Sequence, residues 1–238
     1  MNIKINIEEE ILKKLVNALV FKDDEAEELY QRSINNTSGK GTQNGKHQTH
    51  WNRRYNTIME IAEANGLKSY KIDRIIWEAI IVQDEKGGIY LFFKDNNLKN
   101  IMGKGKETHY AKLLIRAVNK AISELIPTNT QESFLFLENE ANPTYTNEYL
   151  MELAQKILNM FEKEPEKVVI ITFDTKFSSD IAHAYIYNTN YEVIWKKDLT
   201  YLIESNYNPI LGNDNVNPEK QDSSKKSNPK RIVKLKQK

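Results

Sequence analysis

The sequence predicts an α+β fold, in which helices and strands mix along a chain of 238 residues. Two kinds of apolar spacing lead to this prediction. Segments with apolar residues every three or four positions indicate amphipathic helices, and short runs rich in β-branched and aromatic residues indicate strands. The two kinds alternate without the strict rhythm of a doubly wound fold, so the class is α+β, or mixed α/β.

The N-terminal region is predicted to be helical around a polar loop. Apolar residues recur at helical spacing over residues 7–21, and a second helix capped by an aspartate is expected through about Arg32, which together make a helical hairpin. Residues 34–49 hold three glycines and almost nothing apolar, which predicts a loop. A third helix is expected from about Thr49 to Gly66, where the glycine can end it.

The centre of the chain predicts a β-hairpin followed by two helices. Two β-branched and aromatic runs within residues 75–93 flank an Asp-Glu-Lys-Gly-Gly turn, whose glycines can adopt the positive φ of a tight reversal. A short helix is expected over residues 95–102 and ends at Gly103. The clearest apolar stripe runs through residues 109–126, which predicts one continuous helix before Pro127.

The following region predicts a β-α-β unit and a second hairpin. Residues 133–138 and 168–174 are expected to be strands, with a helix over residues 147–162 between them. That crossover length suits parallel pairing of the two strands. Residues 181–187 and 191–196 are expected to form the second hairpin.

The predicted organisation is one α+β domain over residues 1–204, with a possible sub-boundary near residues 127–132. Residues 205–238 are rich in Asn, Asp, Ser, Lys and Pro, which predicts a disordered linker that ends in a basic peptide. No apolar run approaches the roughly 20 residues that a bilayer-crossing helix needs. Three glutamates and two lysines break up the N-terminal apolar stretch, unlike in a signal peptide. We therefore expect a soluble cytoplasmic protein with no membrane association.

Metal and nucleophile chemistry have little support in the sequence. The chain has no cysteine, which excludes disulfides and thiolate zinc sites. His47 and His50 lie three residues apart but lack the further ligands that zinc needs, so neither a metal site nor a cofactor is expected. The Gly-x-Ser-x-Gly elbow of serine hydrolases is absent.

Charge alternates along the chain although the net charge is only +1. Residues 34–126 carry 15 basic and 9 acidic side chains, and residues 205–238 carry 8 and 3. Residues 1–33 and 127–204 are net acidic. This asymmetry favours two hypotheses equally, namely contact with a polyanion and attraction between the two parts of the protein.

The first candidate nucleic-acid site follows the glycine-rich loop. Lys46, Arg53 and Arg54 are interleaved with Trp51 and Tyr55. Aromatic residues among arginines suit base stacking and phosphate contact. The alternative is that the two aromatic residues are core and their charged neighbours are an ordinary solvated surface.

A second anion candidate lies in residues 103–112, where two glycines leave the backbone open and a helix begins near Thr108. The unpaired amides of a helix N-terminus suit phosphate. Glu107 opposes this interpretation, and a solvated helix face is the alternative. The candidate residues are Lys104, Lys106 and His109, together with Lys112, Arg116 and Lys120, whose spacing of four predicts a cationic row on one helix face.

The basic C-terminal peptide is the third candidate. It begins with Lys230 and Arg231. Such a peptide can hold a nucleic-acid backbone, or its alternating residues 231–236 can add as a strand to a sheet edge. The preceding linker would let it reach a partner or return to its own domain.

A nuclease is the catalytic hypothesis. If strands 133–138 and 168–174 are parallel, Glu138 and Asp174 leave the sheet at the same edge, where paired carboxylates could hold Mg²⁺ for phosphodiester hydrolysis. Residues 174–176 also match the Asp-x-Lys form in which an acid and Lys176 share one strand face. Mg²⁺ is a cofactor under this alternative alone.

A block over residues 75–122 combines a strand with Trp77 and an acidic hairpin turn, a Tyr-x-Phe-Phe-Lys strand ending at Lys94, and a helix that starts with His109 and Tyr110. In these motifs it resembles an uncharacterised family of low-GC bacteria and their phages and mobile elements. The resemblance brings no activity. It implies a phage, prophage or defence setting, which favours binding over metabolism, and marks these four residues as positions of interest.

The leading hypothesis is a binding protein of a mobile-element or phage-conflict system, which engages nucleic acid or a partner protein through the basic region 34–126 and the basic tail. One alternative is an Mg²⁺-dependent nuclease that uses Glu138, Asp174 and Lys176. The other is a protein–protein interaction module with no nucleic-acid role, in which the basic and acidic parts pair internally or across a dimer. The oligomeric state is left open.

Overall fold

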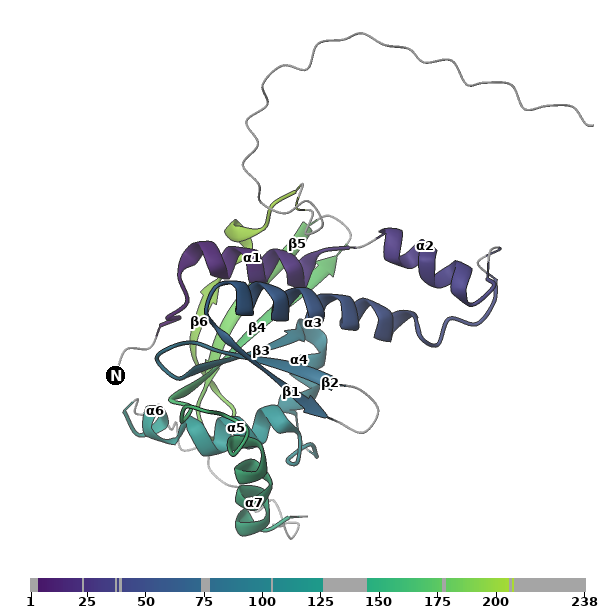
Figure 1. Cartoon of the computed structure of the whole chain (residues 1–238). Helices are drawn as coiled ribbons and strands as arrows, with labels where there is room; N and C mark the ends of the chain where they lie inside the picture. Colours follow the sequence, from purple (N-terminus) through teal and green to yellow (C-terminus); the bar gives the residue numbers. More distant parts are fainter. Residues whose placement is uncertain are drawn as a thin grey trace, which may run out of the picture.

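A computed structural model of the chain describes residues 4–22, 24–36, 38, 40–73, 78–103, 105–125, 145–176, 179–205 and 207 (Figure 1). The fold is α+β, as predicted, and is built on a six-stranded sheet. Within these ranges no helix has the length and apolar content that crossing a membrane requires. The helices are α1 (Glu9–Val20), α2 (Asp24–Ser33), α3 (Lys46–Ala64), α4 (Asp95–Met102), α5 (Tyr110–Val118), α6 (Lys120–Leu125) and α7 (Asn147–Leu158), with a 3₁₀ turn η1 (Thr200–Leu202).

The sheet follows the order of the chain. Its strands are β1 (Lys68–Asp73), β2 (Glu78–Gln83), β3 (Gly88–Lys94), β4 (Lys167–Lys176), β5 (Ser179–Tyr187) and β6 (Val193–Asp198). Every neighbouring pair is antiparallel except β3 and β4, which are parallel. Parallel neighbours need a long crossover, and the segment containing α4 to α7 supplies it.

The parallel partner of β4 is β3, whereas residues 168–174 were predicted to lie parallel to a strand over residues 133–138. The two neighbours of β4 are β3 and β5, so the parallel partner of β4 comes from the central hairpin. Residues 133–138 lie outside the described residues. Strand β3 is buried from Gly88 to Phe93, which is typical of a strand covered on both faces.

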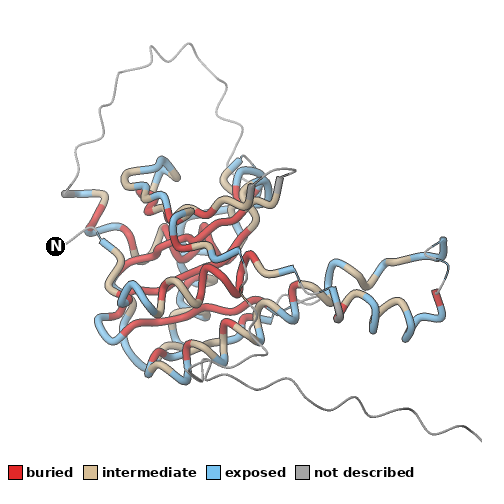
Figure 2. The backbone as a smooth tube through the Cα atoms, turned by 90° about the horizontal axis from the view of Figure 1, so that it is seen from above, coloured by how far each residue is buried: buried red, intermediate tan, exposed pale blue. Residues whose placement is uncertain are grey.

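Helices cover both faces of the sheet (Figure 1). The core on one face joins α1 and α3 to alternate strand residues such as Phe92 and Phe173, and the core on the other joins α4 and α5 to Leu91 and Phe93. Alternate residues of a strand point to opposite faces, so β3 contributes to both cores. Figure 2 shows the buried residues concentrated in the strands and the inner sides of these helices.

The helices and hairpins around the sheet match the predicted elements with several local differences. Helices α1 and α2 both form, and each packs against α3. Helix α3 begins at Lys46, three residues before the predicted Thr49. The sequence analysis missed β1, because this edge strand buries Ile72 alone and lacks a long apolar run.

The predicted helix over residues 109–126 is divided at Asn119. The stretch forms α5 and α6, with Asn119 fully buried between them. Its side-chain amide donates to the Tyr187 carbonyl at 2.8 Å, and its oxygen accepts from the Val168 amide at 2.8 Å. The apolar stripe continues across the break, so periodicity alone predicts one helix.

Candidate functional site

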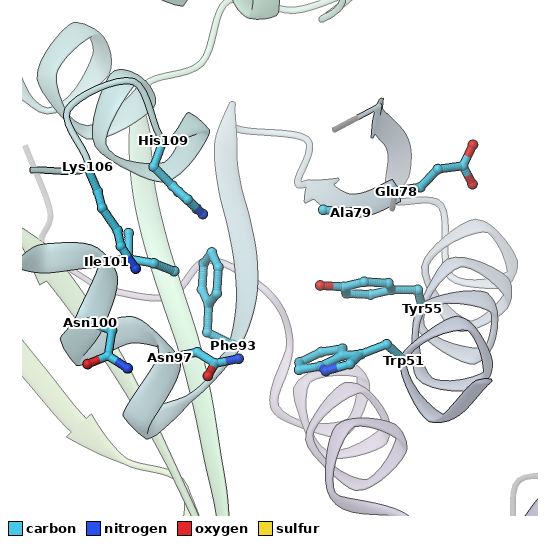
Figure 3. Close-up of a pocket in the computed structure, with 10 residues that line it drawn as sticks. All are labelled: Trp51, Tyr55, Glu78, Ala79, Phe93, Asn97, Asn100, Ile101, Lys106 and His109. Atoms are coloured by element: carbon cyan, nitrogen blue, oxygen red, sulfur yellow. The ribbon is translucent and has the colours of Figure 1, made fainter. Parts of the chain in front are cut away.

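A pocket opens where β2 and β3 separate. The registered pairs of these strands run from Ile81 opposite Leu91 to Gln83 opposite Ile89, and the end of β3 at Phe93 pairs with β4 alone. Beside this end of β3 lies a cavity of about 200 Å³, lined by α3, β2, β3, α4 and the loop before α5 (Figure 3). The pocket therefore lies near the C-terminal end of a parallel strand, where α/β sheets commonly bind ligands.

Four aromatic rings line the pocket. Trp51 and Tyr55 lie one turn apart on α3, with ring centroids 5.0 Å apart and ring planes inclined by 34°. Phe93 and His109 come from β3 and from the start of α5, with centroids 6.0 Å apart. Figure 3 shows the first two rings on one side of the cavity and the other two facing them. The rings of Trp51 and Tyr55 thus pack against each other, and the cavity is a slot with aromatic side chains on both sides.

The polar lining consists mainly of amides and a cation. Asn97 and Asn100 lie on α4, and Lys106 lies in the loop before α5; all three are exposed. Glu78 also lines the pocket, but its side chain points away from the interior (Figure 3), and its carboxylate lies 4.0 Å from the Lys71 ammonium. The groups that face a ligand can donate and accept hydrogen bonds and carry positive charge.

Two buried contacts hold the polar elements in place. The Thr172 hydroxyl of β4 donates to the Asp95 carboxylate at 2.8 Å, which ties the start of α4 to the sheet. Lys112 donates to the Gly103 carbonyl at 2.6 Å and lies 4.7 Å from the Tyr191 ring centroid. This bond holds the end of α4 against α5. The loop that carries Lys106 connects these two helices.

One amide at the start of α5 and one in the loop before it have side-chain partners within the protein. His109 caps the helix, because its Nδ1 accepts from the Ala111 amide at 3.2 Å, and its ring stacks on Tyr110 at 4.7 Å. Glu107 accepts from the Gly105 amide at 3.0 Å. A hydrogen bond from its own backbone amide, and a weaker one from the Gly105 amide, lower the pKa of Glu107. The loop therefore presents Lys106 and the His109 ring, and an internal carboxylate occupies part of the predicted anion site.

The predicted cationic row on one helix face does not form. Lys112 is 2 % exposed, and burial lowers its pKa. Arg116 donates to the Asn147 side chain of α7 at 2.7 Å. Lys120 is exposed but begins α6, beyond the break at Asn119. The three cations therefore belong to three different environments.

Arg54 is tied to the end of α1. Its Nε donates to the Leu19 carbonyl at 2.8 Å, and Nη2 donates to the Phe21 carbonyl at 3.3 Å. The guanidinium lies 5.0 Å from the Phe173 ring centroid and 5.8 Å from that of Trp51, and burial lowers its pKa. A cation at the C-terminal end of a helix is stabilised by the helix dipole. Arg54 therefore joins α3 to the end of α1 beside the Trp51 ring.

The remaining candidates lie apart from the pocket or outside the described residues. Lys46 contacts Glu27 of α2, and Arg53 is exposed on α3. Burial and the Arg54 charge lower the pKa of Lys94, and the smaller effect of the Asp174 carboxylate of β4 opposes them. No cluster of three His, Asp or Glu side chains suited to a metal occurs in the described ranges. Outside those ranges lie Lys104, Glu138, Lys230, Arg231 and the side chain of Lys176.

The pocket combines two stretches that the sequence analysis treated separately. Trp51 and Tyr55 come from the first candidate, and Lys106 and His109 come from the second. Sequence reasoning missed Asn97 and its neighbour Asn100. Their spacing of three places them on one helix face. This spacing alone does not indicate a binding site, because the sequence does not show which elements lie beside that face.

The chain belongs to a family of unknown function, DUF5986, whose family model matches residues 4–238. No curated protein and no solved structure matches the chain. The comparisons thus support the expected membership of an uncharacterised family, and extend it far beyond the block over residues 75–122. They assign no activity to the family.

Proposed function

We propose that this chain, as a member of that family, is a cytoplasmic nucleic-acid-binding protein that holds an unpaired base in the pocket between β2 and β3. The observation that carries the proposal is the meeting of four aromatic rings around one cavity beside Lys106. Stacking of a base on an aromatic side chain contributes about 1–3 kcal/mol and tolerates any sequence.

The size of the pocket supports a single ring system as the ligand. Pockets that enclose drug-sized ligands measure roughly 300–1,000 Å³. The cavity of about 200 Å³ is smaller, and aromatic side chains lie on both sides of it (Figure 3). A flat heterocycle fits such a slot, and the rest of a nucleotide would remain outside.

The charges around the pocket favour an anionic ligand over a cationic one. Aromatic cages can also bind quaternary ammonium groups. Here, however, Lys106 lines the cavity, and the Arg54 guanidinium lies against the Trp51 ring. The Glu78 carboxylate is directed to Lys71 instead of the interior. A cation would be repelled, whereas the phosphate of a nucleotide would meet Lys106 at the opening.

The amides support recognition of a base edge. Asn97 and Asn100 each carry a carbonyl acceptor and an NH₂ donor. Such amides can form paired hydrogen bonds with the edge of a base, as asparagine does with adenine. These two residues would orient a base that the aromatic walls hold by stacking.

The shape of the site supports unpaired nucleic acid over a duplex. The slot lies between α3, α4 and the ends of two strands, so a ligand must insert a ring between them. A base in a duplex is covered by its neighbours above and below and cannot enter without being extruded. We therefore expect single-stranded DNA or RNA to bind more tightly than a duplex of the same sequence.

The test is fluorescence anisotropy with labelled single-stranded and duplex oligonucleotides over a range of salt concentrations. We expect salt-sensitive binding to the single strand. Lys106→Gln should lower the salt slope by roughly 0.7, the value for one phosphate contact on a single strand. Lys86→Gln is the matched control, because Lys86 is exposed in the turn at the opposite end of β3. Absence of binding at low salt, or equal effects of the two variants, would contradict the proposal.

We place this activity in a conflict between a host and a phage or mobile element. The support is the resemblance of residues 75–122 and a binding site without assigned metabolic chemistry. Plaque counts on a bacterial host with and without the expressed chain test this setting. The expected result is a change in plaque number that Lys106→Gln removes and Lys86→Gln retains.

A further inference from the structure

We infer that the ligand is a strand of at least two nucleotides, because a second cavity continues from the aromatic pocket. This inference rests on the proposed function. The second cavity is a groove of about 620 Å³ between the end of β1, the loop before α5, α5 and α7. Lys106 and His109 line both the groove and the pocket, so the two cavities share a wall. A chain that leaves the pocket past these residues enters the groove.

The floor of the groove is suited to a second base. Ile72 of β1, Leu113 of α5, and Leu153 and Ile157 of α7 supply apolar surface. The Tyr110 ring lies among them and is stacked on His109. An apolar and aromatic floor stabilises the face of any base, because every base has a π-face. The groove is also the larger cavity, so it can hold a sugar together with a base.

Two lysines line the groove. Lys106 lies at the wall shared with the pocket, and Lys156 lies on α7. Lys156 forms an ion pair with Glu152 at 3.0 Å, but both side chains are about two-thirds exposed. Exposed ion pairs of this kind contribute little, so a phosphate can compete for the lysine. Asp73 is the acidic residue of the lining, and it favours a course of the phosphates away from β1.

His109 fixes the position of the wall that the two cavities share. Its Nδ1 accepts the Ala111 amide, and its ring stacks on Tyr110, so both the ring position and the start of α5 are anchored. The phosphate that links two nucleotides would pass this ring beside Lys106. The second nucleotide should therefore add affinity without requiring a change in the first site.

The experiment is isothermal titration calorimetry with a mononucleotide, a dinucleotide and a trinucleotide of one base. We expect the dinucleotide to bind at least about fivefold more tightly than the mononucleotide, the factor that the lower limit for one stacked base implies. The trinucleotide should add less than the second nucleotide does. Equal affinity for mono- and dinucleotide would overturn this inference and leave the proposed function standing. Absence of binding by all three would overturn the proposed function itself.

Two exposed variants on α7 locate the second nucleotide. Lys156→Gln should reduce the advantage of the dinucleotide and leave mononucleotide affinity unchanged. Glu152→Gln, which releases Lys156 from its ion pair, should raise dinucleotide affinity. Lys86→Gln is again the control, and thermal unfolding of each variant checks that the fold is retained. Loss of mononucleotide affinity in Lys156→Gln, or no effect on the dinucleotide, would contradict the assignment of the groove.

Discussion

Asn119, between α5 and α6, and Val168, in β4, exchange two hydrogen bonds across 49 positions of the sequence. The Val168 amide donates to the Asn119 side-chain oxygen at 2.8 Å, and the Asn119 amide group donates to the Val168 carbonyl at 3.4 Å. The same amide group donates to Tyr187 of β5. One side chain thus joins the helix that follows the pocket loop to two strands of the sheet.

We expect Asn119→Ala to destabilise the protein strongly. It would leave a buried backbone amide and two buried carbonyls without these partners, and each unpaired group costs roughly 1–3 kcal/mol. Urea denaturation measures the change in the free energy of unfolding. Asn97→Ala is the control, because Asn97 is exposed on α4, and should change stability by less than about 0.5 kcal/mol. Similar stability of the two variants would show that the Asn119 contacts contribute little.

Two neighbouring arginines provide a second test of the fold. Arg54→Met should destabilise the protein by roughly 1–3 kcal/mol, since the Leu19 and Phe21 carbonyls lose a donor. Arg53→Met, at an exposed position, should change the unfolding free energy by less than about 0.5 kcal/mol. Urea denaturation of both variants checks this. Equal losses would mean that the contacts of Arg54 with α1 are not the cause.

Stability at high pH should depend on Tyr187. Burial, with smaller effects of Tyr185 and Asp95, raises its pKa to about 12, compared with about 10 in the unfolded chain. Between these values the folded protein keeps a proton that the unfolded chain releases, so stability falls as pH rises. The contribution is fully present below pH 10.

The measurement is the unfolding free energy of the wild type and of Tyr187→Phe at several pH values. Between pH 10 and pH 12 the wild type should lose up to about 1.4 kcal/mol per pH unit relative to the variant, which cannot ionise at this position. Groups that do not interact with Tyr187 titrate equally in both proteins. A difference that does not change with pH would contradict the buried, protonated tyrosine.

Binding should not require a divalent metal. No cluster of three His, Asp or Glu side chains in the described ranges is suited to a metal, and Asp174 lies where its charge acts on Lys94. We therefore expect binding in EDTA, weakened by Mg²⁺ only as any added salt weakens it, and intact oligonucleotides on a denaturing gel. Shortened products that require Mg²⁺ and disappear in Asp174→Ala would support the nuclease alternative instead.

The candidate site was partly visible in the sequence. Trp51 and Tyr55 stand out because aromatic residues four apart share a helix face, and Lys106 and His109 stand out because they lie near a glycine-flanked helix start. Their proximity was not predictable, because more than 50 residues separate the two stretches. Nor does any local pattern predict that β2 and β3 separate before Phe93, since that depends on how each strand pairs with its other neighbour.

The sequence by itself determined the types of most elements. Apolar periodicity and turn residues act between near neighbours in the chain, so they predict α1, α4, α7 and both hairpins. Tertiary structure alone decided the parallel partner of β4, the edge strand β1, and the break at Asn119. Each of these depends on hydrogen bonds or burial between distant segments. Tertiary structure also decided the pocket, because its walls come from elements that only folding of the sheet brings together.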